Sequence, residues 1–81
     1  MSTTRTYSHA VAEEVRAMMG RRRVTGKQVA AAIGVSQPQA SARINGAVAW
    51  SVDDVYAVAA LLDCKVADLL PDATRQYGLA A

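Results

Sequence analysis

The chain has 81 residues, enough for one small domain, since typical domains contain roughly 100–150 residues. Alanine accounts for 17 residues, aromatic residues are only 5% of the chain, and phenylalanine is absent. Alanine is the strongest helix former, whereas aromatic side chains are enriched in strands. This composition excludes a β-sandwich or a β-barrel and predicts an all-α domain.

Cysteine content and hydropathy indicate the compartment in which the protein is expected. A single cysteine, Cys64, excludes an internal disulfide framework and a zinc site built on several thiolates. The first seven residues are polar, without the apolar core of a signal peptide. The longest aliphatic run, residues 57–62, is six residues long, against about 20 needed to span a bilayer. We therefore expect a cytoplasmic protein with no membrane partner.

The net charge of +2 is unevenly distributed along the chain. Residues 1–52 carry seven basic and two acidic side chains, a net +5, while residues 53–81 carry two basic and five acidic ones, a net −3. A basic half beside an acidic half favours one face that binds a polyanion. Alternatively, the arginine run at residues 21–23 only keeps a helix end soluble, where cations also complement the helix dipole.

Helical periodicity predicts a first helix over residues 8–22, preceded by a flexible arm of residues 1–7. His9 lies on this helix without a second histidine, so a surface or capping role is expected rather than metal ligation. One helical stripe is predicted to face the core, formed by Val11, Val15, Met18 and Met19.

Two segments match the capping box, in which a Ser or Thr and a Glu or Gln three residues later bond each other's backbone amides. TGKQ at residues 25–28 predicts the start of a second helix, which ends at Gly34. SQPQ at residues 36–39 predicts a third helix that begins at Gln37 and ends near Gly46. The inner faces of the two helices are predicted to consist of Val29, Ala30, Ile33, Ala40 and Ile44.

A fourth helix is predicted after Ser51, and a short fifth helix over residues 66–70 closes before a proline. Trp50 is expected to anchor the preceding loop in the core. Residues 71–81 show no convincing period and are assigned to a C-terminal tail. The apolar stripe of the fourth helix is predicted to contain Val52, Val55, Tyr56, Ala59 and Leu62.

Only three residues, 34–36, separate the second and third predicted helices. A glycine that ends one helix and a cap that starts the next predict a helix-turn-helix, whose second helix enters the DNA major groove. The outer surface of this helix is predicted to carry Gln37, Gln39, Ser41 and Arg43, with Ala42 also outward. Glutamine reads adenine, and arginine pairs with guanine or phosphate.

At these residues the chain resembles the helix-turn-helix domains of phage repressors and Cro proteins. The resemblance covers residues 24–70 and is most specific at residues 29–30, at the turn, and at the core residues Ala59, Leu62 and Leu69. It implies a compact, five-helix, lambda-repressor-like domain over residues 8–70, in which Cys64 is a small core residue rather than a reactive thiol. The chain departs from the family pattern where Ile44 replaces a common Glu, Asp63 a common Gly and Met19 a common Arg.

The resemblance implies a sequence-specific double-stranded DNA-binding regulator of transcription, a phage or prophage repressor or Cro-like protein in a bacterial cytoplasm or nucleoid. Its recognition helix would be residues 37–45. We find no catalytic arrangement, metal site or cofactor motif in the sequence, so an enzyme is not expected. The DNA contacts that the resemblance implies are Thr25, Gly26, Lys27, Gln28, Ser36, Gln37, Pro38, Gln39, Ser41, Ala42, Arg43 and Asn45.

Two alternatives remain open: an antitoxin-like or adaptor module that covers another protein, and a DNA-binding domain cut from a longer repressor. No acidic residue occurs from Gln37 to Asn45, which favours DNA over a protein partner. Between a complete protein and a fragment of a longer repressor, we expect an intact small protein. Members of the family commonly dimerise on two-fold operators through residues after the fourth helix. Because Tyr77 and Leu79 are the only sizeable apolar residues of the tail, we expect a monomer or weak homodimer that pairs mainly on DNA.

Overall fold

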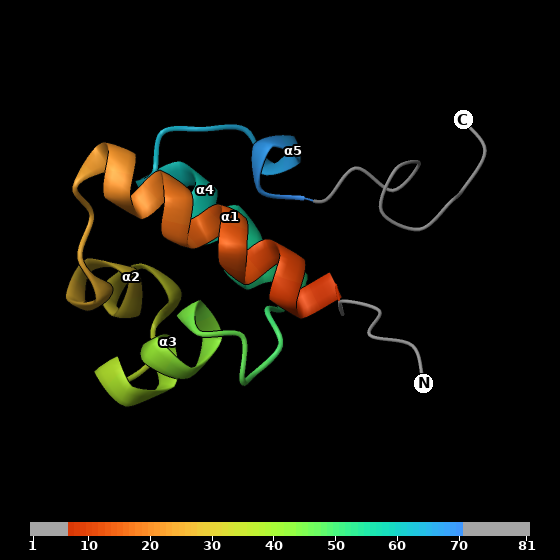
Figure 1. Ribbon diagram of the computed structural model, residues 1–81. Coiled ribbons are helices and arrows are strands. Elements are labelled where there is room, and N and C mark those ends of the chain that lie inside the picture. Colours follow the sequence, from red (N-terminus) through yellow and green to blue (C-terminus); the bar gives the residue numbers. More distant parts are fainter. Residues whose placement is uncertain (1–6, 71–81) are drawn as a thin grey trace, which may run out of the picture.

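The computed structural model describes residues 7–70, which form five α-helices and no strand within that range (Figure 1). The all-α fold predicted from composition is confirmed. The predicted arm and tail lie outside the described residues, except for Tyr7, which is the first residue of the first helix. The helices are α1 (Tyr7–Arg22), α2 (Gly26–Ile33), α3 (Gln37–Ile44), α4 (Val52–Leu61) and α5 (Val66–Leu69).

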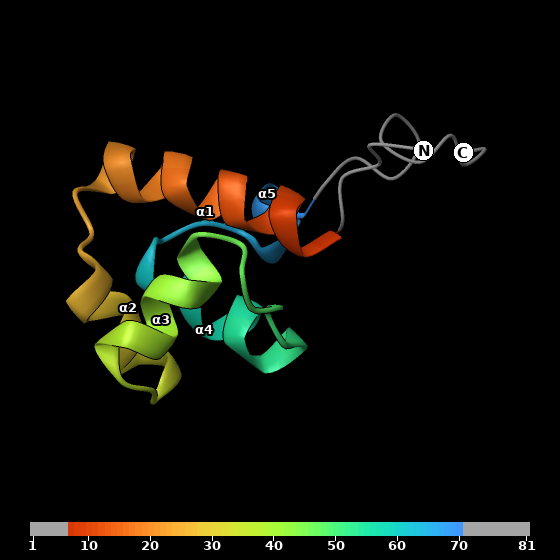
Figure 2. The same cartoon turned by 60° about the horizontal axis from the view of Figure 1, so that its bottom comes forward.

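The long helix α1 lies across the four shorter ones. It packs against α3 and α5, while α2 packs against α3 and α4, and α4 packs against α5. Figures 1 and 2 both show α2 and α3 side by side at one edge of the molecule, on the same side of α1. The pair α2–α3 therefore has one side on the core and another at the surface.

Small aliphatic side chains from all five helices form the core. The predicted α1 stripe is confirmed, because Val11, Val15 and Met18 are buried and Met19 is half-buried. Of the eight described residues of α3, only Ala40 is buried. Since a methyl group is all that α3 inserts fully into the core, most of its side chains remain at the surface. Trp50 is 6% exposed and anchors the α3–α4 loop as predicted.

The predicted stripe of α4 is correct for Val55, Ala59 and Leu62, which are buried, and wrong for two residues. Val52 is 72% exposed and Tyr56 is 62% exposed. Val52 is the first residue of α4, whose first turn projects beyond the helices that cover the rest. Tyr56 follows Val55 directly, so the 100° step of an α-helix turns it away from the core. Val58, which the periodicity did not assign to the core, is buried instead.

The exit of α4 keeps a backbone conformation that usually requires glycine. Asp63 has φ 54°, in the left-handed region, at the position where the resembling family commonly has Gly. Among residues other than glycine, aspartate tolerates this region comparatively well because its short polar side chain bonds locally. The departure at Asp63 therefore preserves the turn that leads from α4 to α5.

The C-terminal end of α3 depends on a close approach between Gly46 and His9. Gly46 is buried with φ 85°, and a Cβ atom added there would lie 2.6 Å from Cδ2 of His9 in α1. The His9 side chain itself is exposed, in agreement with its predicted surface role. Both the conformation and the contact disfavour a side chain at residue 46.

We expect Gly46→Ala to lower the free energy of unfolding by about 1–2 kcal/mol, the cost of placing an L-residue in the left-handed region. Displacement of the His9 ring adds to this loss. Gly20→Ala is the matched control, because no atom lies within 4 Å of a Cβ added at Gly20 in α1. It should raise the free energy of unfolding by roughly 0.5–1 kcal/mol through helix propensity. Urea unfolding of both variants measures these changes, and equal losses in the two would contradict the assignment.

Candidate nucleic-acid interface

The turn between α2 and α3 consists of residues 34–36 and is closed by backbone hydrogen bonds. Gly34 has φ 73°, and the amides of Gly34 and Val35 both donate to the carbonyl oxygen of Ala30, at 2.9 and 3.0 Å. This left-handed ending stops α2, as predicted. Ser36 then caps α3 directly, so no further residue separates the two helices.

Both predicted capping boxes are confirmed. Thr25 Oγ1 accepts a hydrogen bond from the amide of Gln28 at 3.2 Å, and Gln28 Oε1 accepts one from the amide of Thr25 at 2.8 Å. Ser36 Oγ accepts from the amide of Gln39 at 3.3 Å, and Gln39 Oε1 accepts from the amide of Ser36 at 3.0 Å. In both glutamines the carboxamide oxygen is thus bound to backbone, while the carboxamide nitrogen is a donor on an exposed residue.

The outer face of α3 is uncharged and polar. Gln37, Pro38, Gln39 and Ser41 are exposed, as the sequence predicted for the polar members of this set. Asn45 follows as the C-terminal cap, is exposed, and donates from Nδ2 to Ser41 Oγ at 3.5 Å. A row of amide and hydroxyl groups on one helix face is suited to hydrogen bonding with base edges.

The predicted outward orientation of Arg43 is wrong. Its Nε donates to Asp54 Oδ2 at 3.1 Å, its Nη1 donates to the carbonyl oxygen of Gln39 at 3.0 Å, and its side chain is only 20% exposed. The fold brings the first turn of α4 beside the end of α3, and the guanidinium pairs with the carboxylate that it meets there. Ala42 is also half-buried rather than outward, since its carbonyl oxygen accepts from the amides of Ala47 and Val48 as the loop folds over it.

Side chains from outside α3 satisfy its last carbonyl groups. Arg16 of α1 donates from Nη1 to the carbonyl oxygen of Ile44 at 2.7 Å, and Trp50 donates from Nε1 to that of Arg43 at 2.9 Å. The sequence analysis missed both bonds. A buried tryptophan usually finds a partner for its N–H, which is a signal for the second bond. The first joins residues 28 positions apart and has no local signal.

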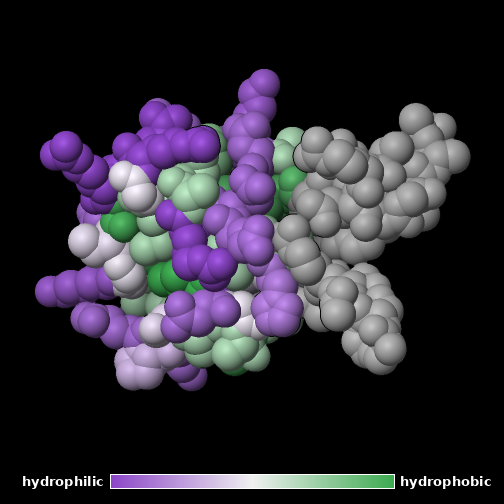
Figure 3. All heavy atoms as spheres, viewed as in Figure 1, coloured by the Kyte–Doolittle hydropathy of each residue, from purple (hydrophilic) through white to green (hydrophobic). Residues whose placement is uncertain are grey.

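Exposed basic side chains gather where α1 ends and α2 begins. Arg21, Arg22, Arg23 and Lys27 are all exposed there. Figure 3 shows hydrophilic side chains that project from this end of the molecule. Charge and the amides at the N-terminus of α2 favour an anion here.

Cys64 has no features of a reactive thiol. It is half-buried against the core, close to its predicted role as a small core residue. Burial raises the pKa of the Cys64 thiol, and the Asp68 carboxylate raises it further. The thiol therefore stays protonated at neutral pH, where it is a poor nucleophile.

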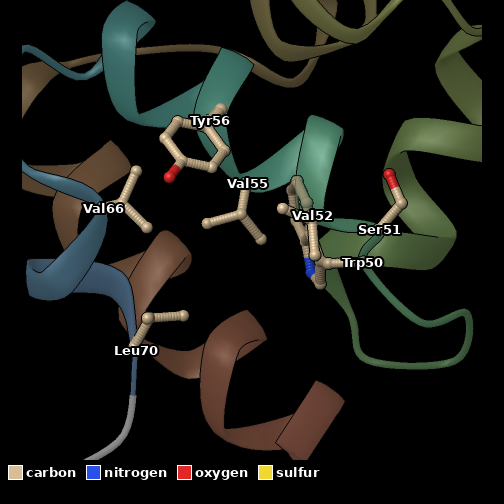
Figure 4. A pocket seen from close by; sticks show the side chains of 7 residues that line it. All are labelled: Trp50, Ser51, Val52, Val55, Tyr56, Val66 and Leu70. Carbon is tan, nitrogen blue, oxygen red and sulfur yellow. The ribbon is translucent and has the colours of Figure 1, made fainter.

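An apolar pocket of about 180 Å³ lies between the start of α4 and α5 (Figure 4). Its walls include the exposed side chains of Val52 and Tyr56, with Val55 between them and Val66 and Leu70 opposite.

Among the described residues, no group of three or more His, Cys, Asp or Glu side chains is placed to hold a metal ion. None of the described helices is long and apolar enough to cross a membrane.

The two capped helices, their three-residue turn and the exposed polar face of α3 define a helix-turn-helix domain of the DNA-binding class. The family model of the Cro/C1-type HTH DNA-binding domain matches residues 14–72, more than half of the chain, and the chain belongs to this family. A match was found neither among curated proteins nor among solved structures. The family confirms the predicted resemblance and fold class and indicates a DNA-binding regulator.

Proposed function

We propose that the protein is a sequence-specific regulator of transcription that binds double-stranded operator DNA, of phage or prophage repressor or Cro type. It would act without catalysis or a cofactor, in the cytoplasm or nucleoid of a bacterial host. The observation that carries the proposal is the exposed, acid-free polar face of α3, held at its start by the Ser36–Gln39 capping box. Such a face is what a helix in the major groove presents to base edges.

Two groups of contacts divide the interface in this proposal. Base edges are read by Gln37 and Ser41, and by Gln39 through its carboxamide nitrogen. The exposed Pro38 offers a small apolar surface that lets α3 approach closely, whereas the half-buried Ala42 has no base contact in this proposal. The backbone phosphates are bound by the start of α2 and by residues that flank α3, namely Thr25, Gly26, Lys27, Gln28, Ser36 and Asn45.

A protein-interaction module is the second candidate, favoured by one observation. The apolar side chains of Val48, Val52 and Tyr56 are 42%, 72% and 62% exposed, and the last two line the apolar pocket. This surface belongs to the α3–α4 loop and α4, whereas the proposed DNA contacts belong to α2 and α3. Substitutions on the two surfaces therefore distinguish the candidates: changes at Val48, Val52 or Tyr56 should leave DNA binding unaltered, whereas changes at the proposed contacts of α2 and α3 should weaken it.

Selection of duplexes with a randomised central segment, followed by footprinting on the enriched sequence, tests the proposal directly. A regulator of this type should enrich one motif and protect it against cleavage. Enrichment of no motif at physiological salt would contradict sequence-specific binding. The enriched duplex also serves as the probe in the measurements below.

We expect the affinity for this duplex to fall steeply with salt, because counterions are released when phosphates are neutralised. Each phosphate contact adds about 0.9 to the slope of log affinity against log salt, so four to six contacts give a slope of roughly −4 to −5. Fluorescence anisotropy over a salt series measures the slope. An affinity that does not change between low and physiological salt would contradict the proposed electrostatic contacts.

Base reading should be confined to α3. We expect Gln37→Ala to cost about 1–3 kcal/mol against the best duplex and to relax the preference for one base pair, because a base contact is lost. Lys27→Ala should weaken binding to all sequences about equally, since it removes only a phosphate contact. If Gln37→Ala bound the best duplex like the wild type, the role of α3 would be misassigned.

The capping glutamines provide a matched pair for the same question. Gln39→Glu and Gln28→Glu each keep an oxygen acceptor for the capping box and each add one negative charge near a helix start. Both should weaken DNA binding generally. Only Gln39→Glu should also change the preferred sequence, because it replaces the carboxamide donor on the proposed base-reading face.

We propose that the free protein is mainly monomeric and pairs on DNA. Among the described residues, three large apolar side chains are exposed, those of Val48, Val52 and Tyr56. They are too few to bury the roughly 800 Å² that each partner contributes to a standard protein–protein interface. Analytical ultracentrifugation should show monomers at low micromolar concentration, and mobility shifts on a duplex with two half-sites should show cooperative binding. A dimer that persists at nanomolar concentration would contradict this expectation.

A further inference from the structure

We propose that Arg43 is a positioning residue: together with Trp50 and Asp54 it fixes the orientation of α3 relative to α4, and it does not contact DNA. These three residues are here called the Arg43 network. The inference rests on the proposed function, since orientation matters because α3 reads the operator. It assigns a role to a basic residue that the sequence placed among the DNA contacts.

On the α4 side, the carboxylate of Asp54 takes part in both the N-terminal cap of α4 and the ion pair with Arg43. Its Oδ2 accepts a hydrogen bond from the backbone amide of Ser51 at 3.4 Å and the ion pair from Arg43 Nε at 3.1 Å. Ser51 Oγ in turn accepts from the amide of Asp54 at 3.0 Å, which completes the cap of α4. The guanidinium of α3 is therefore bound directly to the N-terminal cap of α4.

On the α3 side, Arg43 is held at both its side chain and its backbone. Its Nη1 reaches back one turn to the carbonyl oxygen of Gln39 at 3.0 Å, and its own carbonyl oxygen accepts from Trp50 Nε1 at 2.9 Å. Because Trp50 is anchored in the core, the last turn of α3 is tied to the core as well as to α4. The bond to Gln39 carries this restraint to the turn that bears the proposed base contacts.

The connection between α3 and α4 is held by backbone hydrogen bonds, from the amides of Ala47 and Val48 to the carbonyl oxygen of Ala42, but by few buried side chains. Ala47, Val48 and Ala49 of the loop are all exposed, and α3 has only one fully buried side chain among its eight described residues. Helix α3 packs on α2 and α1 but not on α4, so the Arg43–Asp54 ion pair is a direct side-chain link between α3 and α4. If Arg43 turned to a phosphate, it would leave the Asp54 carboxylate, only 15% exposed, without its ion-pair partner.

Substitution of Asp54 distinguishes positioning from contact by the sign of its effect. Asp54→Asn keeps an oxygen for the cap of α4 but removes the charge that holds Arg43. A positioning role predicts binding to the selected duplex that is roughly three- to tenfold weaker. A phosphate contact predicts stronger binding, because Arg43 is released toward DNA. Asp53→Asn is the matched control: it removes the same charge from the same turn at an exposed residue outside the network, and it should not weaken binding.

Substitution of Arg43 separates the two roles through the salt dependence of DNA binding. Loss of a phosphate contact would change this dependence, whereas loss of a positioning residue would not. Arg43→Ala should weaken binding while the salt slope stays unchanged, whereas loss of a phosphate contact would reduce the slope by about 0.9. The double variant Arg43→Ala/Asp54→Asn should bind no worse than the weaker single variant. Arg43→Lys should also weaken binding, since one ammonium group cannot reproduce the guanidinium fork that joins Asp54 to Gln39.

The single tryptophan of the chain reports on the network without DNA. In the free protein, Arg43→Ala and Asp54→Asn should shift the Trp50 indole N–H resonance and speed its hydrogen exchange, and Asp53→Asn should leave both unchanged. Unchanged indole signals in the first two variants, or stronger DNA binding by Asp54→Asn, overturn the inference. A wild-type protein that selects no duplex overturns the proposed function instead, and the indole signals still show whether the network exists.

Discussion

The structure depends on holding the short helix α3 from its ends. Helix α3 has eight residues, below the roughly 12–15 at which an isolated helix becomes even marginally stable, and Ala40 is the one fully buried residue among them. One buried methyl group contributes little hydrophobic stabilisation. Hydrogen bonds at both termini therefore add to the packing of α3 on α2 and α1: the Ser36–Gln39 box at the start, and bonds from Arg16 and Trp50 to the last carbonyl groups.

This arrangement explains why the outer face of α3 is free for recognition. A helix held through a wide apolar stripe needs bulky residues over about 100° or more of its surface, whereas one held partly at its ends needs a smaller contact on that side. Gln37, Gln39 and Ser41 are consequently exposed without loss of the helix. The Gly34 turn fixes where α3 begins, and the network at Asp54 relates its end to α4.

The sequence predicted what is encoded locally. Capping boxes, the ending at Gly34 and the apolar period of α1 all arise within a few residues, and each was located correctly from its pattern. The capping box of α4 has the same pattern, Ser51 followed three residues later by Asp54, but only the Ser51 cap was recognised. The orientation of Arg43 was mispredicted because its partner lies 11 residues away, across a loop. Tyr56 and Val52 were misplaced because periodicity gives the spacing of a stripe and not the extent of the helices that cover it.

The structure shows which basic side chains of residues 1–52, the basic half of the chain, are free to attract an anionic ligand and which are bonded within the protein. Of its arginines, Arg16 and Arg43 are bonded to α3 within the protein, and Arg21, Arg22 and Arg23 lie exposed beside the start of α2. The net charge of residues 1–52 therefore overstates the charge that reaches a ligand. Within the part of the chain that the structure describes, the exposed cations of this half lie on α1, the α1–α2 connection and the first turn of α2 rather than on α3. In the proposed complex, attraction to phosphates would come mainly from the region where α1 ends and α2 begins, while the neutral face of α3 would distinguish base pairs. Affinity and specificity would then be altered separately, by substitutions on different helices.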